Sequence, residues 1–254
     1  MLQVKRLRLV TFDVTETLLN FRTSPAEKYA QVGAQFGVHV DPGEITSNFK
    51  QQFRGMSVSH PNFGYKTGLG WEKWWKQLIR RTFEATGKCT HIDGTILDRI
   101  GDHLLEIYKT AECWEVMKGA HQLLSHLNTQ DIALGIISNN DERLETVLMA
   151  MDLRHYFQFV INSYSAGFEK PDVRILELAM YQLGNKTVKA NEALHVGNSP
   201  ALDYMGAINA GWNAALVHQN ATKVTHDHQD INPEFVFETL QDLQSYITKL
   251  QLAI

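Results

Sequence analysis

A single carboxylate, Asp13, follows a short apolar run near the start of the sequence. Residues 7–12 read Leu-Arg-Leu-Val-Thr-Phe, which is typical of a strand buried on both faces of a parallel sheet. Because an unpaired carboxylate is costly to bury, we expect Asp13 at the strand end, facing a cleft where open α/β sheets bind ligands. A carboxylate held there can attack phosphorus or carbon and become a covalent aspartyl ester. The ordinary alternative is a turn former or helix cap.

Polar residues also end two later apolar runs. Ser138 and Asn139 follow one of them, and Asn198 follows the other, with Asp203 on the segment beyond it. A Ser-Asn pair after a strand is also a common helix cap. Hydroxyl, amide and carboxylate oxygens are, however, suitable partners for a phosphoryl group and a hard cation.

A lysine next to a proline is a further candidate. Lys170 directly precedes Pro171, and a proline at a helix start would fix the local backbone and aim the lysine. Its ammonium group would neutralise a carboxylate nucleophile and the charge that gathers on a transferred group. Taken alone, a lysine in such a position is an ordinary solvated surface residue.

The order of these residues resembles that of the haloacid dehalogenase-like (HAD) hydrolases. Residues 13–19, Asp-Val-Thr-Glu-Thr-Leu-Leu, resemble the first motif, whose usual form is Asp-x-Asp-x-Thr/Val, and Ser138, Lys170 and 197–203 follow in the order of the other three motifs. The resemblance covers nearly the whole chain. Segments such as the Trp-Trp pair at 74–75 are similar to the rhythmically expressed gene two subgroup of that family.

The resemblance implies a role for each of these residues. Asp13 would be the nucleophile, and Ser138, Asn139 and Lys170 would bind the phosphoryl group. The residues expected to hold Mg²⁺ are Asp13, the backbone carbonyl of Thr15, Asn198 and Asp203. The implied partner is a small phosphorylated substrate.

Two positions depart from the family pattern. Thr15 stands where the family has an aspartate that protonates the leaving group and activates water, a contribution of about 10²–10⁴-fold. Threonine cannot do this work at neutral pH, so we expect slow turnover and a preference for good leaving groups. Asn198 stands where the family has an acid. Its amide oxygen can still bind Mg²⁺, but with one negative charge fewer we expect a reduced affinity.

Three hypotheses of function follow. The first is a slow Mg²⁺-dependent phosphatase that forms an aspartyl phosphate on Asp13. The second is a catalytically impaired relative that serves as a binding or regulatory module. The third is metal-independent hydrolysis of a carbon–halogen bond, for which family dehalogenases carry a tyrosine at the Thr15 position and an arginine in the cap. The tyrosine is absent, and Arg22 and Arg54 are only loose candidates for the arginine.

The spacing of apolar residues predicts which elements position these groups. Helical patterns dominate residues 21–113, including 26–36, 42–53 and the stripe that begins at Trp71, with an irregular loop over 55–70. From residue 114 onward, short apolar strands alternate with helices, which indicates right-handed crossovers and a parallel sheet. We therefore predict an α/β fold: a doubly wound, Rossmann-like core of residues 1–20 and 114–254 with an inserted all-helical cap of residues 21–113.

Composition narrows the remaining possibilities. The chain has 254 residues, 44% of them hydrophobic, and a formal net charge of −4. A nucleic-acid partner would need a basic face, so none is expected. Because no segment is apolar enough to span a bilayer and the two cysteines fit no metal spacing, we expect an intracellular, cytoplasmic protein with reduced thiols and no membrane partner. The oligomeric state cannot be predicted from the sequence.

Two further patterns have ordinary interpretations that we favour. The tryptophans at 71, 74 and 75 could line a cavity, but their helical spacing is explained by packing within the helical segment. His226-Asp227-His228 could bind a metal, but we expect a solvated polar loop before the last helix.

Overall fold

The structure is a computed structural model that describes residues 7–89, 92–184 and 188–252, and the side chains up to residue 249. The chain divides by its internal contacts into two compact units. Unit 1 comprises residues 1–20, 116–139 and 152–254, and unit 2 comprises residues 21–115 and 140–151. Each unit is described by itself.

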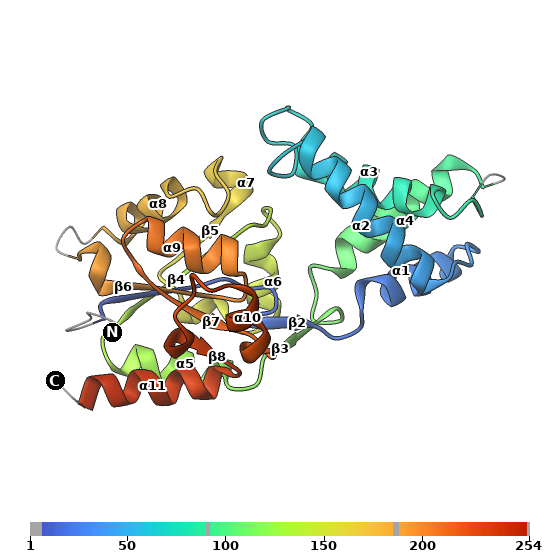
Figure 1. Ribbon diagram of the computed structural model, residues 1–254. Coiled ribbons are helices and arrows are strands. Elements are labelled where there is room, and N and C mark those ends of the chain that lie inside the picture. The colour runs from blue at the N-terminus through green and yellow to red at the C-terminus, as the bar shows by residue number, and fades with distance from the viewer. Residues whose placement is uncertain (1–6, 90–91, 185–187, 253–254) are drawn as a thin grey trace. The chain divides into compact units, whose positions relative to one another are not determined.

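Unit 1 is built on a parallel sheet. The described residues of this sheet form six strands in the order β5-β4-β1-β6-β7-β8 (Figure 1). The strands are β1 (Leu9–Phe12), β4 (Ala133–Ser138), β5 (Phe159–Asn162), β6 (Ala193–Gly197), β7 (Asn213–Val217) and β8 (Val236–Phe237). Strand β1 pairs in parallel with β4 on one side and β6 on the other. The three strands that precede Asp13, Ser138 and Asn198 are therefore neighbours.

Helices cover both faces of this sheet. Figure 1 shows α8 and α9 on one face and α5 and α11 on the other. The helices of unit 1 are α5 (Ala120–Thr129), α7 (Ser163–Ala166), α8 (Arg174–Leu183), α9 (Met205–Asn209), α10 (Ala221–Asp227) and α11 (Leu240–Leu252). A core of fully buried residues, such as Leu9, Ile175 and Leu216, lies between these layers. The predicted doubly wound α/β fold is confirmed.

Two details of unit 1 depart from the predicted alternation of apolar strands and helices. After β6 the chain forms a π-helical turn, Pro200–Tyr204, followed by the short α9. The last strand is β8, which is too short to give an apolar run in the sequence. It pairs with β7 and has buried Phe237 as its inward residue.

Unit 2 is helical, apart from residues 21 and 114–115, which belong to two short strands described below. Its helices are α1 (Pro25–Gln35), α2 (Pro42–Ser59), α3 (Trp71–Glu84), α4 (Gly94–Ile107) and α6 (Leu144–Ala150). Ser24 caps α1 through a reciprocal bond with Glu27, and Asp41 caps α2. These caps stabilise helix starts whose first N–H groups lack partners within the helix.

Helix α2 runs further than the sequence pattern predicts. The loop was expected from Gly55, but the helix continues to Ser59. Met56 is fully buried and packs in one cluster with Trp74 and Leu78. Burying such a side chain contributes about 1.5–3 kcal/mol, which outweighs the cost of about 1 kcal/mol for a glycine inside a helix. The packing interpretation of Trp74 agrees with this burial.

A two-stranded ribbon joins the helical segment to the rest of the chain. Strand β2 (Leu19–Phe21) pairs with β3 (Trp114–Val116), and the Arg22 N–H donates to the Cys113 carbonyl at 3.0 Å. The segment between the two strands thus begins and ends at adjacent points. The contacts also place residues 140–151 with the helices, a segment that the sequence-derived boundaries assign to the core.

A buried carboxylate joins α6 to α3 within unit 2. Asp141 is fully buried, and its two oxygens accept hydrogen bonds from the Arg143 guanidinium and from the Trp75 indole N–H. The guanidinium also lies over the rings of Trp71 and Trp75. Both described cysteines are free and buried, and no described helix is long and apolar enough to cross a membrane.

Candidate active site

Lys170 joins the two carboxylates that the sequence predicts for the site. Its Nζ donates to Asp13 Oδ1 at 2.7 Å, to Asp203 Oδ1 at 2.7 Å and to the Ile137 carbonyl at 2.8 Å. These three bonds use all three N–H donors of the ammonium group. Lys170 is 3% exposed. Burial lowers its pKa, but the two carboxylates outweigh this effect and raise the pKa above its ordinary value, so the group stays charged.

Both carboxylate oxygens of Asp203 have hydrogen-bond partners. Its Oδ1 also contacts His195 Nε2 at 3.1 Å, and its Oδ2 accepts from the backbone N–H groups of Asn198 and Ser199 at 3.1 and 2.8 Å. Burial raises its pKa, but Lys170 and His195 outweigh this and keep it well below the ordinary range. Gly197 makes the approach possible, because a Cβ at that position would overlap the Asp203 carboxyl group.

His195 is a buried member of the site that the sequence reasoning missed. Its Nδ1 lies 2.9 Å from Thr11 Oγ1, on the neighbouring strand β1. Burial lowers the pKa of His195, and the Lys170 charge adds to this, so the ring is neutral at pH 7. Since ionised Asp203 can only accept, we assign the ring proton to Nε2, which leaves Nδ1 to accept from the Thr11 hydroxyl. The available signal was a polar residue inside an apolar strand.

Asn139 fixes the backbone that carries Lys170. Its Oδ1 accepts from the Lys170 backbone N–H at 2.7 Å, and its Nδ2 donates to the Lys170 carbonyl at 2.9 Å. Ser138, the last residue of β4, is buried, and no described residue hydrogen-bonds to its hydroxyl. Thus Asn139 acts here on the lysine, while the hydroxyl of Ser138 is available to a ligand.

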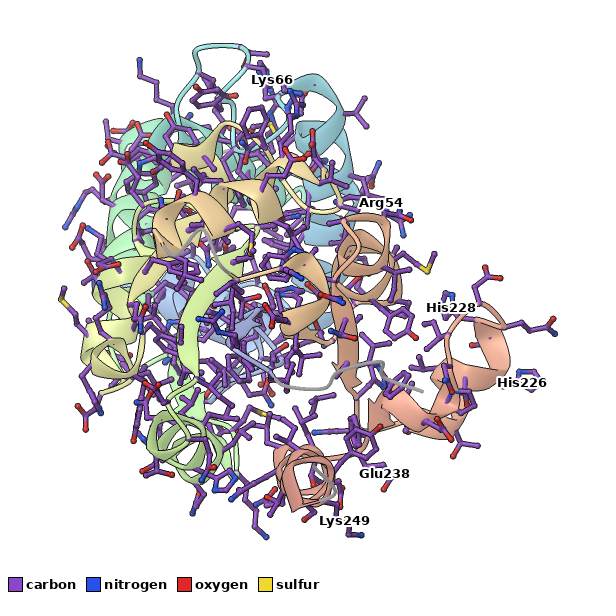
Figure 2. The ribbon with its side chains drawn as sticks, turned by 90° about the vertical axis from the view of Figure 1, so that its left-hand side faces the viewer. Arg54, Lys66, His226, His228, Glu238 and Lys249 are labelled. Carbon is purple, nitrogen blue, oxygen red and sulfur yellow. The ribbon has the colours of Figure 1, made fainter. Side chains whose placement is uncertain are left out.

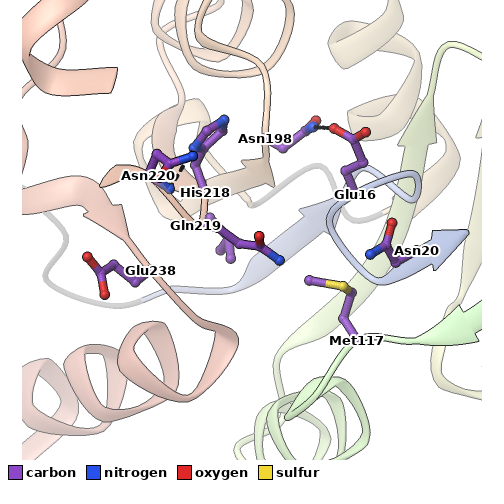
Figure 3. A pocket seen from close by; sticks show the side chains of 9 residues that line it. Glu16, Asn20, Met117, Asn198, His218, Gln219, Asn220 and Glu238 are labelled. Carbon is purple, nitrogen blue, oxygen red and sulfur yellow. Dashed lines mark hydrogen bonds between the residues drawn. The ribbon is translucent and has the colours of Figure 1, made fainter. Parts of the chain in front are cut away.

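Thr15 and Asn198 lie on the two loops that follow β1 and β6. Thr15 forms an isolated bridge with Leu19. The Asn198 amide donates through Nδ2 to Glu16 Oε2 at 2.9 Å (Figure 3). Glu16 and Asn198 also line a cavity of about 220 Å³ together with residues such as Asn20, His218 and Glu238. Asp13, Ser138 and Lys170 are not among its lining residues.

The oxygen atoms at this edge fit a hard cation. Within the described ranges, no three His, Cys, Asp or Glu side chains gather as a metal site. Asp203 has its acceptors occupied, whereas Asp13 Oδ1 keeps a second lone pair beside its bond to Lys170, and the Asn198 amide oxygen accepts no bond from a described residue. With the Thr15 carbonyl these are oxygen ligands, the type that Mg²⁺ prefers, in a set that leaves room for water. The residues present therefore fit a magnesium site with Asp13 as its one carboxylate ligand. Asp203 is joined to this site through the Lys170 ammonium instead of being a ligand.

The His226-Asp227-His228 pattern lies elsewhere in unit 1. His226 lies in the last turn of α10, its Nδ1 is 3.1 Å from Asp227 Oδ1, and its side chain is exposed. Figure 2 shows His226 and His228 at the end of α10, and both residues are exposed. This agrees with the solvated polar interpretation, although the segment is the end of a helix rather than a loop.

Sequence comparisons place the chain among known proteins. Residues 7–211 match the haloacid dehalogenase-like hydrolase family. The Rhythmically expressed gene 2 protein of Drosophila melanogaster is 40% identical over 256 residues, which cover 98% of each chain. The Haloacid dehalogenase-like hydrolase domain-containing protein 3 of Homo sapiens is 34% identical over 212 residues, covering 84% of this chain and 82% of that protein.

Solved structures share the fold. The putative HAD-hydrolase YfnB from Bacillus subtilis, bound to magnesium, gives a TM-score of 0.68 at 20% identity, covering 96% of this chain and 100% of that one. The L-2-haloacid dehalogenase from Xanthobacter autotrophicus gives 0.67 at 20% identity, with 95% and 98% covered. With the site geometry and the sequence match, these findings show that the chain belongs to the haloacid dehalogenase-like hydrolase family.

Proposed function

We propose that this protein is a slow Mg²⁺-dependent phosphatase that acts on a small phosphomonoester through an aspartyl phosphate on Asp13. One observation carries the proposal. Asp13 has one oxygen held by the Lys170 ammonium at 2.7 Å and the other unoccupied by any described donor. An anchored carboxylate with one open oxygen beside a fixed positive charge is arranged for nucleophilic attack.

The first step is transfer of the phosphoryl group to the protein. Asp13 Oδ2 attacks phosphorus, a new O–P bond forms, and the bond to the leaving oxygen breaks with its electron pair. Lys170 keeps its proton, because its pKa is raised, and so stabilises charge rather than acting as an acid. Ser138 is the candidate hydroxyl donor to a phosphoryl oxygen. Water then releases phosphate and restores Asp13.

Thr15 limits both steps. A leaving oxygen needs a proton unless it is stable as an anion, and Thr15 cannot supply one at neutral pH. We therefore expect acyl and aryl phosphates to react faster than alkyl phosphates. Mg²⁺, when held by Asp13, Asn198 and the Thr15 carbonyl, would supply charge neutralisation for the phosphoryl oxygens. The partners expected are the phosphorylated small molecule alone, with no nucleic acid or membrane, and we propose a cytoplasmic location.

A second candidate is a binding module with little turnover. Its support is that Lys170 donates all its hydrogen bonds within the protein, so it has none left for a phosphoryl group. Carbon–halogen hydrolysis ranks third, because Thr15 offers none of the aromatic surface that the dehalogenase resemblance requires.

A phosphatase assay separates these candidates. Purified protein and Asp13→Asn are assayed with acetyl phosphate, p-nitrophenyl phosphate and an alkyl phosphate, with and without Mg²⁺. The proposal predicts turnover that needs Mg²⁺, falls to background in Asp13→Asn and follows leaving-group quality. No turnover from either protein favours the binding module. Thr15→Asp should raise alkyl phosphate turnover about 10²-fold or more, and an unchanged rate would contradict the role given to Thr15.

A further inference from the structure

Glu16 occupies an unusual backbone conformation for its residue type. Its φ is +60°, in the left-handed region that glycine adopts without cost and other residues adopt only against steric resistance. Strained positions of this kind persist where surrounding structure holds them, and they gather at functional sites. Glu16 lies in the loop directly after Asp13 and Thr15, so its side chain is placed beside the metal-binding edge.

The Glu16 carboxylate fixes the orientation of the Asn198 amide. Asn198 Nδ2 donates to Glu16 Oε2 at 2.9 Å, and the carboxylate can only accept. Turning the amide over would place two oxygen atoms in contact, so one orientation is selected. The backbone N–H of Asn198 is tied to Asp203 Oδ2. The Asn198 amide oxygen is then the atom of this side chain that remains available to a cation.

We infer that Glu16 is a positioning residue of the magnesium site, which holds Asn198 with its amide oxygen free for Mg²⁺. The inference rests on the proposed function, because it concerns the same cation. It also assigns Glu16, the next acidic residue after Asp13 in the sequence, a role other than general acid, since its carboxylate accepts from Asn198 Nδ2. The carboxylate of Glu16 thus places a negative charge next to Asn198, the expected ligand residue that carries no charge itself.

Glu238 provides a matched control. It lines the same cavity as Glu16 and Asn198 (Figure 3). Among the described residues, Asn198 Nδ2 donates to Glu16 and not to Glu238. Replacing either glutamate removes one carboxylate from the lining of the same cavity. Only the Glu16 replacement removes the partner of the Asn198 amide.

Mg²⁺ binding, measured by isothermal titration calorimetry without substrate, tests the inference. Glu16→Gly should bind Mg²⁺ about 10- to 100-fold more weakly, the usual effect of removing a group that orients a metal ligand. Glu16→Gln should stay within about 3-fold of the natural protein, because its amide oxygen still accepts from Asn198 Nδ2. Glu238→Gln should not change the affinity. If Glu16 has a purely structural role, Glu16→Gly should leave the Mg²⁺ affinity unchanged. It should then only raise the melting temperature, because glycine relieves the left-handed strain.

A double-mutant cycle with Asn198→Asp sharpens the test. With Glu16 present, Asn198→Asp sets two carboxylates side by side, and their repulsion reduces the benefit of the added charge. In the Glu16→Gly background the repulsion is gone, so Asn198→Asp should increase Mg²⁺ affinity at least 10-fold more than it does alone. Additive effects, or equal Mg²⁺ affinity of Glu16→Gly and the natural protein, overturn the inference. If the natural protein binds no Mg²⁺ at millimolar concentration, both the inference and the metal dependence in the proposed function fail. Normal Mg²⁺ binding with turnover that survives Asp13→Asn overturns the proposed function alone.

Discussion

Two buried carboxylates in this molecule, Asp13 in unit 1 and Asp141 in unit 2, are each paired with a cation. Asp141 accepts four hydrogen bonds, from the backbone N–H, Nε and Nη2 of Arg143 and from Trp75 Nε1. Asp13 accepts one side-chain hydrogen bond, from Lys170. The side chain of Asp141 has no exposed surface, whereas that of Asp13 is 11% exposed. A carboxylate with every lone pair engaged serves structure, and one with an open oxygen can react.

Lys170→Met should have the largest effect on this comparison. It leaves Asp13 and Asp203 buried without their shared cation, and breaking a buried pair costs about 3–5 kcal/mol. With two carboxylates affected, we expect a loss near 5 kcal/mol in the free energy of unfolding. Urea denaturation of the variant, alone and with Asp13→Asn, measures it. The second change should recover part of the loss, and no recovery would mean that Asp13 is not coupled to Lys170.

Arg143→Met tests the other member of the comparison. We expect a loss of about 3 kcal/mol, at the lower end for a buried pair, because Trp75 Nε1 and a backbone N–H still bond to Asp141. Trp75→Phe in the Arg143→Met background should add a further loss, which urea denaturation followed by tryptophan fluorescence will report. If the single variant is as stable as the natural protein, Asp141 is not the structural counterpart that we describe.

His195 should make the Asp203 side of the cluster sensitive to acid. Its folded-state pKa is lowered, by burial first and then by the Lys170 charge, so below about pH 6.5 the unfolded chain binds a proton that the folded chain does not. Stability is therefore complete above that pH and falls as the pH drops, by at most about 1.4 kcal/mol per pH unit. The low pKa of Asp203 acts in a separate window, below about pH 4. The free energy of unfolding, measured by urea denaturation at several pH values between 7 and 5, should fall less steeply with pH in His195→Gln. In the exposed control His226→Gln it should fall as steeply as in the natural protein.

Lys88→Met should have the smallest effect. Lys88 Nζ lies 2.7 Å from Glu44 Oε2, the same distance that joins Lys170 to Asp13, but both side chains are 45% exposed. Exposed pairs contribute about 0–1 kcal/mol. The difference from the natural protein should disappear in 0.5 M salt. A loss as large as that of Lys170→Met would show that distance, and not burial, sets the strength of these pairs.

Much of the fold was predictable because strands buried on both faces leave short apolar runs. The run before Asp13 and the runs before Ser138 and Asn198 correspond to β1, β4 and β6. The end of α2 was not predictable in this way, because Gly55 signals a break and only packing of Met56 against distant Trp74 overrides it. Strand β8 leaves too short a signal to detect.

The site was predictable where a residue type and its position at a strand end coincide. Asp13, Lys170 and Asp203 are brought together by hydrogen bonds across the fold. The assignment of Asn139 to a phosphoryl group stays a prediction. In the structure the Asn139 side chain is hydrogen-bonded to the Lys170 backbone. His195 and Glu16 were missed, because their hydrogen-bond partners, Thr11 and Asn198, are remote from them in the sequence.

The paired strands β2 and β3 make the helical segment a removable module in the topological sense. Their neighbouring ends, marked by the Arg22 to Cys113 bond, would let a short turn replace residues 23–112 without reaching across the fold. Such an excision would not be clean. Asp141 and Arg143 would stay with the truncated chain while Trp75 left it, so Asp141 would lose one of its hydrogen-bond donors and the packing that α1–α4 contribute to unit 2. Any exchange of this segment between relatives must therefore bring its own partner for position 141.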